Sequence, residues 1–243
     1  MEPSNIVFDF SDKRALVIGG SSGIGKGVVD SLLAAGAAVT YASRSKMEGD
    51  CKANFIETDI TKQVEVEALF KNKSISERLD ILINSAAITY SKKINEIEIT
   101  EWDEVTHVNL RAWFLVCKLA ANLMVKQRSG RIVNISSISG HHRSLVAGVH
   151  YVSSKAGVIG LTKQLAFELG PSGINVNVVC PSQTLTPMLQ KAMSPEEKEG
   201  LARSIPLRRI ASISDQVGPI LFLCRDAAKY ITGAVLNVNG GQI

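Results

Sequence analysis

Short apolar runs alternate with longer segments of helical periodicity along almost the whole chain, and this alternation constrains the fold more than any other feature. The apolar runs cover residues 14–18, 38–42, 54–57, 79–83, 131–135, 174–179 and 234–238. The segments of helical period include 24–35, 62–74, 101–127 and 152–169. Near-continuous apolar strands that alternate with helices predict an α/β fold, in which a seven-stranded parallel sheet is doubly wound with helices on both faces.

The seven runs form one series without a linker rich in Pro, Gly or Ser, so the sequence predicts a single domain over residues 1–243. Two connections differ from the regular alternation. Too few residues separate the second run from the third for a full crossover helix, so that helix is expected to be very short or absent. Segment 186–206, bounded by prolines and rich in Met, Glu and Lys, is the longest excursion.

The composition narrows the class of protein. The net charge is +4 and basic residues alternate with Asp and Glu, which argues against a nucleic-acid-binding surface. The four cysteines are far apart and form no Cys-x-x-Cys, so no disulfide framework and no metal site are expected, in keeping with a reducing compartment. The N-terminus lacks the pattern of a signal peptide, and no run of about 18 apolar residues occurs. We therefore expect a soluble cytoplasmic protein without membrane contact.

The first apolar run leads directly into a glycine-rich turn at the start of a helix. Gly19, Gly23 and Gly25 are spaced as G-x-x-x-G-x-G, and the helix follows from Lys26. Glycines allow a tight turn and close approach of a ligand, and the first turn of a helix offers free N–H groups and the positive end of its dipole. The turn thus predicts a site for the pyrophosphate of a dinucleotide.

From this turn onward the sequence resembles the compact, classical form of the short-chain dehydrogenase/reductase family. The family's marks occur in the family's order: Gly19…Gly23-Ile24-Gly25, Asp59, Asn84-Ser85-Ala86-Ala87, Asn109, Ser137, Tyr151-x-x-x-Lys155, Pro181-Ser182 and the ending Tyr230-Ile231-Thr232-Gly233…Val238-Asn239-Gly240-Gly241. Each mark alone is weak, but their joint order over nearly the whole chain argues strongly against coincidence. The resemblance implies a Rossmann-type fold and an oxidoreductase that uses a nicotinamide cofactor.

The sequence departs from the family's pattern at three positions. Ile18 stands where the family often has Thr, Ala87 where Gly is usual, and Ser182 where a Pro-Gly pair is expected. Ala87 and Ser182 both lie near where the cofactor would sit, so its local fit there is expected to differ.

Tyr151 and Lys155 are the expected centre of the chemistry. Reduction of a carbonyl needs a proton, and a tyrosine with its ordinary pKa near 10 is a slow acid or base at neutral pH. Lys155 follows one helical turn later on the same face, so its charge is expected to favour the tyrosinate and to lower the pKa of Tyr151. The resemblance gives Lys155 a second role, a hydrogen bond to the nicotinamide ribose.

Two further catalytic residues are implied by the resemblance. Ser137 would hydrogen-bond the substrate oxygen, and Asn109 would hold a water that links Lys155 to solvent. The stretch from Ser137 to Tyr151 is slightly long for the family, so Ser136 and Ser139 remain alternatives to Ser137. The nearby residues His141 and His142 are expected to be exposed loop residues, and their spacing suits no metal site.

The end of the second strand predicts which nicotinamide cofactor is bound. An Asp or Glu there would accept hydrogen bonds from a ribose 2′-OH and would repel a 2′-phosphate. This chain has Ser43 and then Arg44, whose guanidinium suits a phosphate, so NADP(H) is expected. The resemblance also implies a mobile substrate segment over 186–206. The remaining cofactor contacts that it implies are Ser21, Ser22, Ile24, Asp59, Ile60, Asn84, Ala86, Pro181, Thr184 and Thr186.

The sequence therefore predicts an NADP(H)-dependent oxidoreductase acting on a small-molecule carbonyl/alcohol pair. A 3-oxoacyl-acyl-carrier-protein reductase is one specific candidate, because the stretch 205–210 is similar and Arg128 suits an acidic carrier, although Ser172 replaces the second Arg usual in such enzymes. Reductases of small ketones, sugars or polyols are the others. A non-catalytic NADP-sensing protein and an epimerase of the family's extended branch are alternatives, but the catalytic residues are present and the chain is short for that branch.

A homo-oligomer, a tetramer or a dimer, is also implied by the resemblance, because compact members commonly associate through two long helices. Small residues Ala156, Gly157 and Gly160 and the apolar stretch 113–115 lie in the two helices concerned. The same residues could instead pack against their own sheet.

Overall fold

A computed structural model describes residues 8–144 and 146–243. Within these ranges one parallel sheet has the strand order β3-β2-β1-β4-β5-β6-β7. The strands are β1 (Arg14–Ile18), β2 (Ala38–Ser43), β3 (Asn54–Glu57), β4 (Ile81–Asn84), β5 (Gly130–Ile135), β6 (Ile174–Pro181) and β7 (Val235–Val238). All seven predicted strands are thereby confirmed, with small shifts at their ends.

The helices are α1 (Gly23–Ala34), α2 (Gln63–Lys71), α3 (Lys73–Ser76), α4 (Ile99–Thr106), α5 (Ala112–Gln127), α6 (Val149–Leu169), α7 (Pro187–Ala192), α8 (Pro195–Ser204) and α9 (Ile213–Leu223). Short 3₁₀ turns cover Ile94–Glu96, Ile138–Gly140, Gly170–Ser172 and Asp226–Ala228. The predicted helix 101–127 is interrupted, because a π-helical turn, His107–Arg111, joins α4 to α5. Residues 44–53, between β2 and β3, contain no helix, as the sequence indicates.

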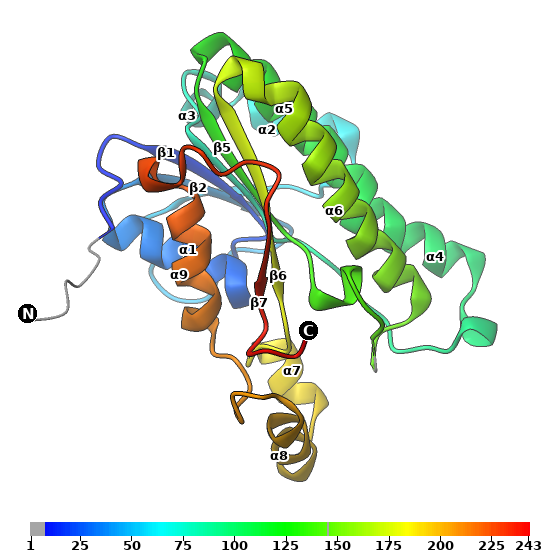
Figure 1. The fold of residues 1–243 in the computed structure, drawn as a ribbon. Helices are drawn as coiled ribbons and strands as arrows, with labels where there is room; N and C mark the ends of the chain where they lie inside the picture. The colour runs from blue at the N-terminus through cyan, green and yellow to red at the C-terminus, as the bar shows by residue number, and fades with distance from the viewer. Residues whose placement is uncertain (1–7, 145) are drawn as a thin grey trace, which may run out of the picture.

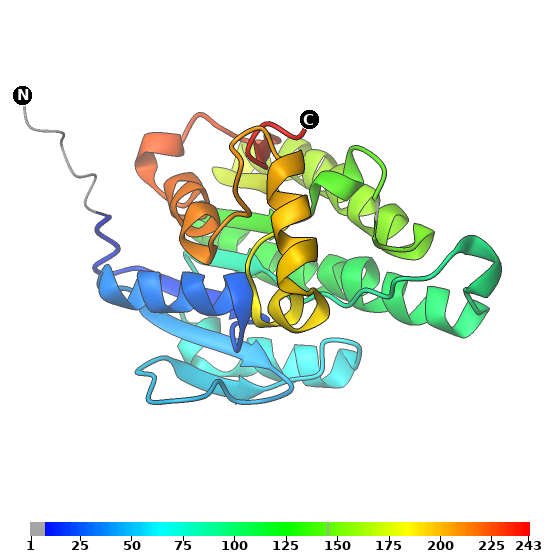
Figure 2. The same cartoon turned by 90° about the horizontal axis from the view of Figure 1, so that it is seen from below.

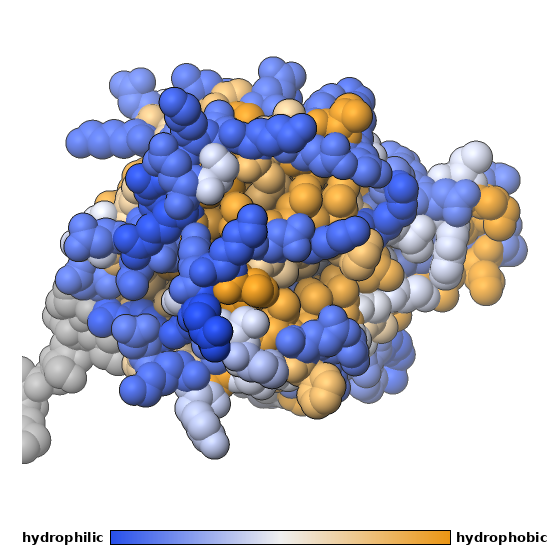
Figure 3. All heavy atoms as spheres, turned by 90° about the horizontal axis from the view of Figure 1, so that it is seen from above, coloured by the Kyte–Doolittle hydropathy of each residue, from blue (hydrophilic) through white to orange (hydrophobic). Residues whose placement is uncertain are grey.

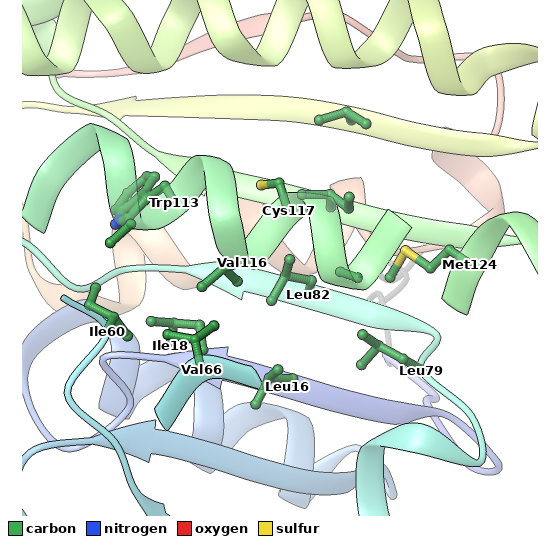
Figure 4. Close-up of a cluster of buried hydrophobic side chains, with 14 of the residues drawn as sticks. Leu16, Ile18, Ile60, Val66, Leu79, Leu82, Trp113, Val116, Cys117 and Met124 are labelled. Carbon is green, nitrogen blue, oxygen red and sulfur yellow. The ribbon is translucent and has the colours of Figure 1, made fainter. Parts of the chain in front are cut away.

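Helices cover both faces of the sheet (Figures 1 and 2). On one face α1 and α9 pack against each other and bury Val28, Leu32 and Ile220 in one apolar cluster. On the other face α2, α5 and α6 enclose a second cluster, part of which is drawn in Figure 4. The two clusters flank the sheet, which is the doubly wound arrangement that the alternation of strands and helices predicts.

The order of the strands indicates where a ligand of this sheet would bind. The chain runs from β1 outward to β2 and β3, then crosses back to β4 on the other side of β1. The connections that follow β1 and β4 therefore diverge, and ligands of such sheets bind outside the carboxyl ends of the strands at this point. Helices α7 and α8, within segment 186–206, stand beyond the ends of β6 and β7 (Figure 1).

One helical run in the structure is unusually long and apolar. The helical run Ile99–Gln127 is long and apolar enough to cross a membrane by length and composition, with a mean hydropathy of 1.3 in its most apolar window. Of that window, 44% is buried inside the protein, where α5 contributes to the core as a sheet-covering helix does. Elsewhere hydrophilic side chains border an area where hydrophobic atoms reach the surface (Figure 3).

Candidate active site

The glycine turn after β1 forms an open cradle of backbone. Gly19 has a φ of +79°, and a Cβ there would lie 2.5 Å from the backbone nitrogen of Ala86. Gly23 has a φ of +54° and begins α1, with Thr186 facing it from the start of α7. Ser22, the N-cap, makes no side-chain cap hydrogen bond. Only glycine fits this close turn without strain, and the first amides of α1 point to a space that suits a pyrophosphate.

Ser43 and Arg44 end β2 beside this cradle. The Ser43 hydroxyl donates to the carbonyl oxygen of Ser45 at 2.7 Å. Arg44 is exposed, and no ion pair among the described residues involves it. Its charge contributes to the lowered pKa of Asp59, so the two side chains share one region. A free guanidinium at the end of β2 is thus available to an anion.

Asp59 and Ile60 follow β3. Burial raises the pKa of the Asp59 carboxyl, but hydrogen bonds from the hydroxyl and the amide of Thr61, at 2.7 and 3.0 Å, outweigh burial and lower it overall. Ile60 is buried in the core. The Asp59 carboxylate therefore accepts its hydrogen bonds from Thr61, two residues further along the same turn.

The Asn84 side chain makes its hydrogen bonds inside the protein core. It is fully buried and donates to Asn134 Oδ1 at 2.8 Å and to Cys117 Sγ at 3.3 Å. Ala86, by contrast, lies against Gly19 and donates its amide to the Ile18 carbonyl oxygen at 3.1 Å. A cofactor contact through the Asn84 side chain stays a prediction, since that side chain links strands inside the sheet.

Three of the predicted cofactor-binding residues lie at the end of β6 or shortly after it. Pro181 is the buried last residue of the strand, and Thr184 is buried with its hydroxyl on the Ser182 carbonyl oxygen at 3.0 Å. Thr186 caps α7, because its hydroxyl accepts from the amide of Leu189 at 3.4 Å. Of the three, Thr186 is the one that the structure brings to the glycine turn.

Lys155 lies deep in α6, with 2% of its surface exposed. Its Nζ donates to the Ile135 carbonyl oxygen at the end of β5, at 2.9 Å. Burial lowers the pKa of Lys155 to about 7. No carboxylate among the described residues pairs with it, so its charge depends on the few groups that face it.

Tyr151 lies beside Lys155, and Ser137 lies beside Tyr151. Lys155 Nζ is 5.7 Å from the centroid of the Tyr151 ring. Burial raises the pKa of the Tyr151 phenol, and a hydrogen bond with the Ser137 side chain opposes that rise. Without ligands, burial therefore keeps the pKa of Tyr151 above its ordinary value, and a lowering of that pKa by Lys155 stays a prediction.

The alternatives to Ser137 are committed elsewhere or buried. The Ser136 hydroxyl donates to the Lys155 carbonyl oxygen at 2.8 Å, and Ser139 is 7% exposed. Ser137 alone of the three contributes to the pKa of Tyr151. His141 and His142 are exposed, as expected. The geometry therefore favours Ser137 as the hydroxyl next to Tyr151.

Asn109 occupies the π-helical turn and is fully buried. Its Oδ1 accepts from the Ile88 amide, and its Nδ2 donates to the Ile88 carbonyl oxygen, both at 2.9 Å. Nδ2 also donates to Ser154 Oγ at 3.1 Å. Asn109 thus fastens the loop after β4 to α6, while the water predicted to link it to Lys155 stays a prediction.

Two residues beside Lys155 were not predicted as site residues. Trp113, expected in an oligomer-forming stretch, is fully buried, and its ring centroid lies 4.7 Å from Lys155 Nζ. Cys180, in β6, influences the pKa values of both Tyr151 and Lys155, and burial raises its own pKa to about 11. Trp113 and Lys155 belong to different helices, so no local pattern in the sequence indicates their contact.

Comparisons with known proteins find similar sequences and structures over nearly the whole chain. A family model described as enoyl-(acyl carrier protein) reductase matches residues 18–242. The 3-oxoacyl-[acyl-carrier-protein] reductase FabG of Aquifex aeolicus is 38% identical over 95% of this chain and 97% of its own. A short-chain dehydrogenase of Leptospira borgpetersenii with bound NAD⁺ has a TM-score of 0.91 at 31% identity, over 100% of this chain and 97% of that one. A protein of Beutenbergia cavernae described as an NAD(P)-dependent gluconate 5-dehydrogenase, with bound NADP, has a TM-score of 0.90 at 30% identity, over 97% and 98%.

Proposed function

Because the chain belongs to the short-chain dehydrogenase/reductase family of oxidoreductases, we propose that it is an NADP(H)-dependent enzyme that interconverts a carbonyl and an alcohol. The observation that carries the proposal is the group formed by the buried Lys155 and the half-buried Tyr151 and Ser137, in a chain that also has a glycine turn at the start of α1. When bound, the nicotinamide cofactor supplies or accepts the hydride.

The residues of the chain handle the proton and the developing charge. Tyr151 donates its phenolic proton to the carbonyl oxygen during reduction and takes it back during oxidation. Ser137 hydrogen-bonds the same oxygen, which stabilises the charge that develops there. Lys155, when protonated, would favour the tyrosinate and oppose the effect of burial. Asn109 keeps the loop after β4 next to α6, so these groups hold their relative positions.

The cofactor would lie with its pyrophosphate at the first turn of α1 and its 2′-phosphate at Arg44. The lack of an acid at Ser43 and the unpaired guanidinium next to it support NADP(H) over NAD(H). Lys155 would hold the nicotinamide ribose and Thr186 the carboxamide. Structures of similar proteins contain either NAD⁺ or NADP, so the preference rests on this chain's own residues.

A 3-oxoacyl thioester is the first candidate substrate, supported by the name of the Aquifex relative. Arg128 is exposed at the end of α5, and a Cβ at Gly173 would lie 2.7 Å from the Arg128 carbonyl oxygen, so the turn with Ser172 is its neighbour. We expect Arg128→Glu to raise the KM for a substrate on acyl carrier protein and to leave the KM for the corresponding coenzyme A thioester unchanged. Equal KM changes for both would argue against a carrier docking there.

The test of the activity is NADPH oxidation at 340 nm with a panel of 3-oxoacyl thioesters, small ketones and ketoses. Turnover of at least one class, lost in Tyr151→Phe, is the expected result. NADPH binding without turnover on any of them would instead favour the NADP-sensing alternative. Turnover that Tyr151→Phe retains would reject the assignment of the acid.

Two further proposals concern the oligomeric state of the enzyme and its cellular compartment. We propose a homo-oligomer, supported by the exposed aromatic side chains Phe114, Phe167 and Tyr230, which are 52%, 80% and 100% exposed. A monomer in light scattering at micromolar concentration would reject it. We also expect the cytoplasm as the compartment, since all four cysteines are free and three of them are buried.

A further inference from the structure

The ring of Trp113 lies against the Lys155 ammonium. Lys155 Nζ lies 4.7 Å from the centroid of the Trp113 ring, well within the range of a cation–π contact. The indole N–H donates to the Ala86 carbonyl oxygen at 3.0 Å, which fixes the orientation of the ring. Figure 4 shows Trp113 on α5 at the end of the core cluster where Ile18 and Ile60 lie.

The ammonium has few other partners. A lysine ammonium carries three donors, and the hydrogen bonds of the described residues give Lys155 one acceptor, the Ile135 carbonyl oxygen. The titratable groups that face it are Tyr151 from α6 and Cys180 from β6, and neither is a carboxylate. The negative face of the indole is therefore the feature of the site that takes the place of a counter-ion.

We propose that Trp113 is a positioning residue, which uses its ring face to hold the Lys155 ammonium in its charged form beside Tyr151. The inference deepens the proposed function, since it rests on the role of Lys155 in that reaction. Burial alone lowers the pKa of Lys155 to about 7, and a ring face that stabilises the cation opposes this. The indole N–H to Ala86 links that effect to the loop that contacts the glycine turn.

The first test needs neither cofactor nor substrate. The chain has two tryptophans, so Trp102→Phe leaves Trp113 as the single tryptophan, and excitation at the red edge of its absorption avoids the tyrosines. We expect its emission to titrate with a midpoint at or above about 7 as Lys155 loses its proton, and Lys155→Met to abolish that titration. Burial raises the pKa of Cys180 to about 11 and raises that of Tyr151 above its ordinary value, so neither group titrates near pH 7. A flat emission, or a titration that persists in Lys155→Met, would overturn the proposal.

The second test compares Trp113→Leu with Trp113→Phe. Leucine removes the ring face, whereas phenylalanine keeps a ring and removes the N–H. We expect Trp113→Leu to lose about tenfold or more of the wild-type rate at pH 8 and much less at pH 6, where Lys155 stays charged, because a desolvated cation–π contact is worth at least a factor of this size. Trp113→Phe should restore most of the rate. A loss that is equal at both pH values, or a Phe variant no better than Leu, would show a purely structural role.

The two failures are distinguishable. If no carbonyl substrate is reduced, the proposed function fails, yet the emission titration of Trp113 still decides whether its ring senses Lys155. If turnover occurs and the emission is flat, the proposed function stands and the role of Trp113 fails. Melting temperatures of all variants check that each remains folded.

Discussion

The two halves of the carboxyl edge of the sheet are built differently. At β1 and β2 the site consists of backbone amides, a glycine turn and the exposed residue Arg44. At β5 and β6 it consists of side chains, of which Lys155 and Asn109 are buried, with 2% and 0% of their surface exposed, and Tyr151 and Ser137 are half-buried. The first half offers backbone amides and a guanidinium to an anion, whereas in the second half burial raises the pKa of Tyr151 and lowers that of Lys155. The difference indicates that one half binds and the other reacts.

The largest expected effect belongs to the reacting half. Tyr151→Phe removes the phenolic proton and keeps the ring, so we expect turnover to fall by about 10²–10⁴-fold, the usual contribution of general acid–base catalysis. Steady-state NADPH oxidation with the best substrate measures it. If the variant kept more than about a tenth of the wild-type rate, Tyr151 would not be the general acid, and the assignment of the chemistry to this half of the site would be wrong.

The second effect concerns stability and pH. The pKa of Lys155 is about 7 in the folded protein and 10.5 ordinarily, so the unfolded state binds the proton more tightly. The penalty on folding is therefore complete below pH 7 and fades as pH rises toward 10.5. By linkage, the advantage of Lys155→Met in unfolding free energy should shrink by about 1.4 kcal/mol for each pH unit between these values. Urea unfolding of both proteins at pH 7 and pH 9 measures it. A constant difference would mean that Lys155 is not held in a dry site.

The third effect belongs to the binding half. Gly19→Ala places a side chain on a residue at φ +79° and pushes it toward the Ala86 backbone. Strain of this kind costs on the order of 1–3 kcal/mol, so we expect the Kd for NADPH to rise about tenfold or more, with the sheet still formed. Calorimetric titration measures the Kd. Gly49→Ala is the matched control, because Gly49 has a φ of +83° with no atom within 4 Å of its Cβ position. Equal Kd changes in both variants would mean that the turn is not the cradle.

The smallest effect is the choice of cofactor. A charge-assisted hydrogen bond contributes about 1.5–3 kcal/mol, so NADPH should bind at least about tenfold more tightly than NADH. Ser43→Asp/Arg44→Ala should reverse that order, because the new carboxylate accepts from a 2′-OH and repels a 2′-phosphate. Dissociation constants of both cofactors, in both proteins, measure it. Equal affinities of the wild type would remove Arg44 from the site.

The same contrast explains what the sequence predicts and what it leaves open. Gly19 and the Tyr151–Lys155 spacing are local patterns, so the turn and the helical pair could be predicted from a few adjacent residues. The buried position of the Asn84 side chain and the raised pKa of Tyr151 depend on residues from other elements. The contact of Trp113 with Lys155 joins residues of α5 and α6, and no local pattern encodes it. The π-helical turn at Asn109 likewise follows from its hydrogen bonds to Ile88 and Ser154.

The most direct test of the division between binding and chemistry is one crossed measurement of NADPH affinity and turnover in Arg44→Ala and Tyr151→Phe. The account predicts that Arg44→Ala weakens NADPH binding about tenfold and keeps the wild-type kcat at saturating NADPH, because Arg44 touches no reacting atom. It predicts that Tyr151→Phe keeps the wild-type Kd and loses the rate. If Tyr151→Phe lost NADPH affinity in proportion to its rate, or Arg44→Ala lost kcat without losing affinity, the two halves would not be separate and the account would be contradicted.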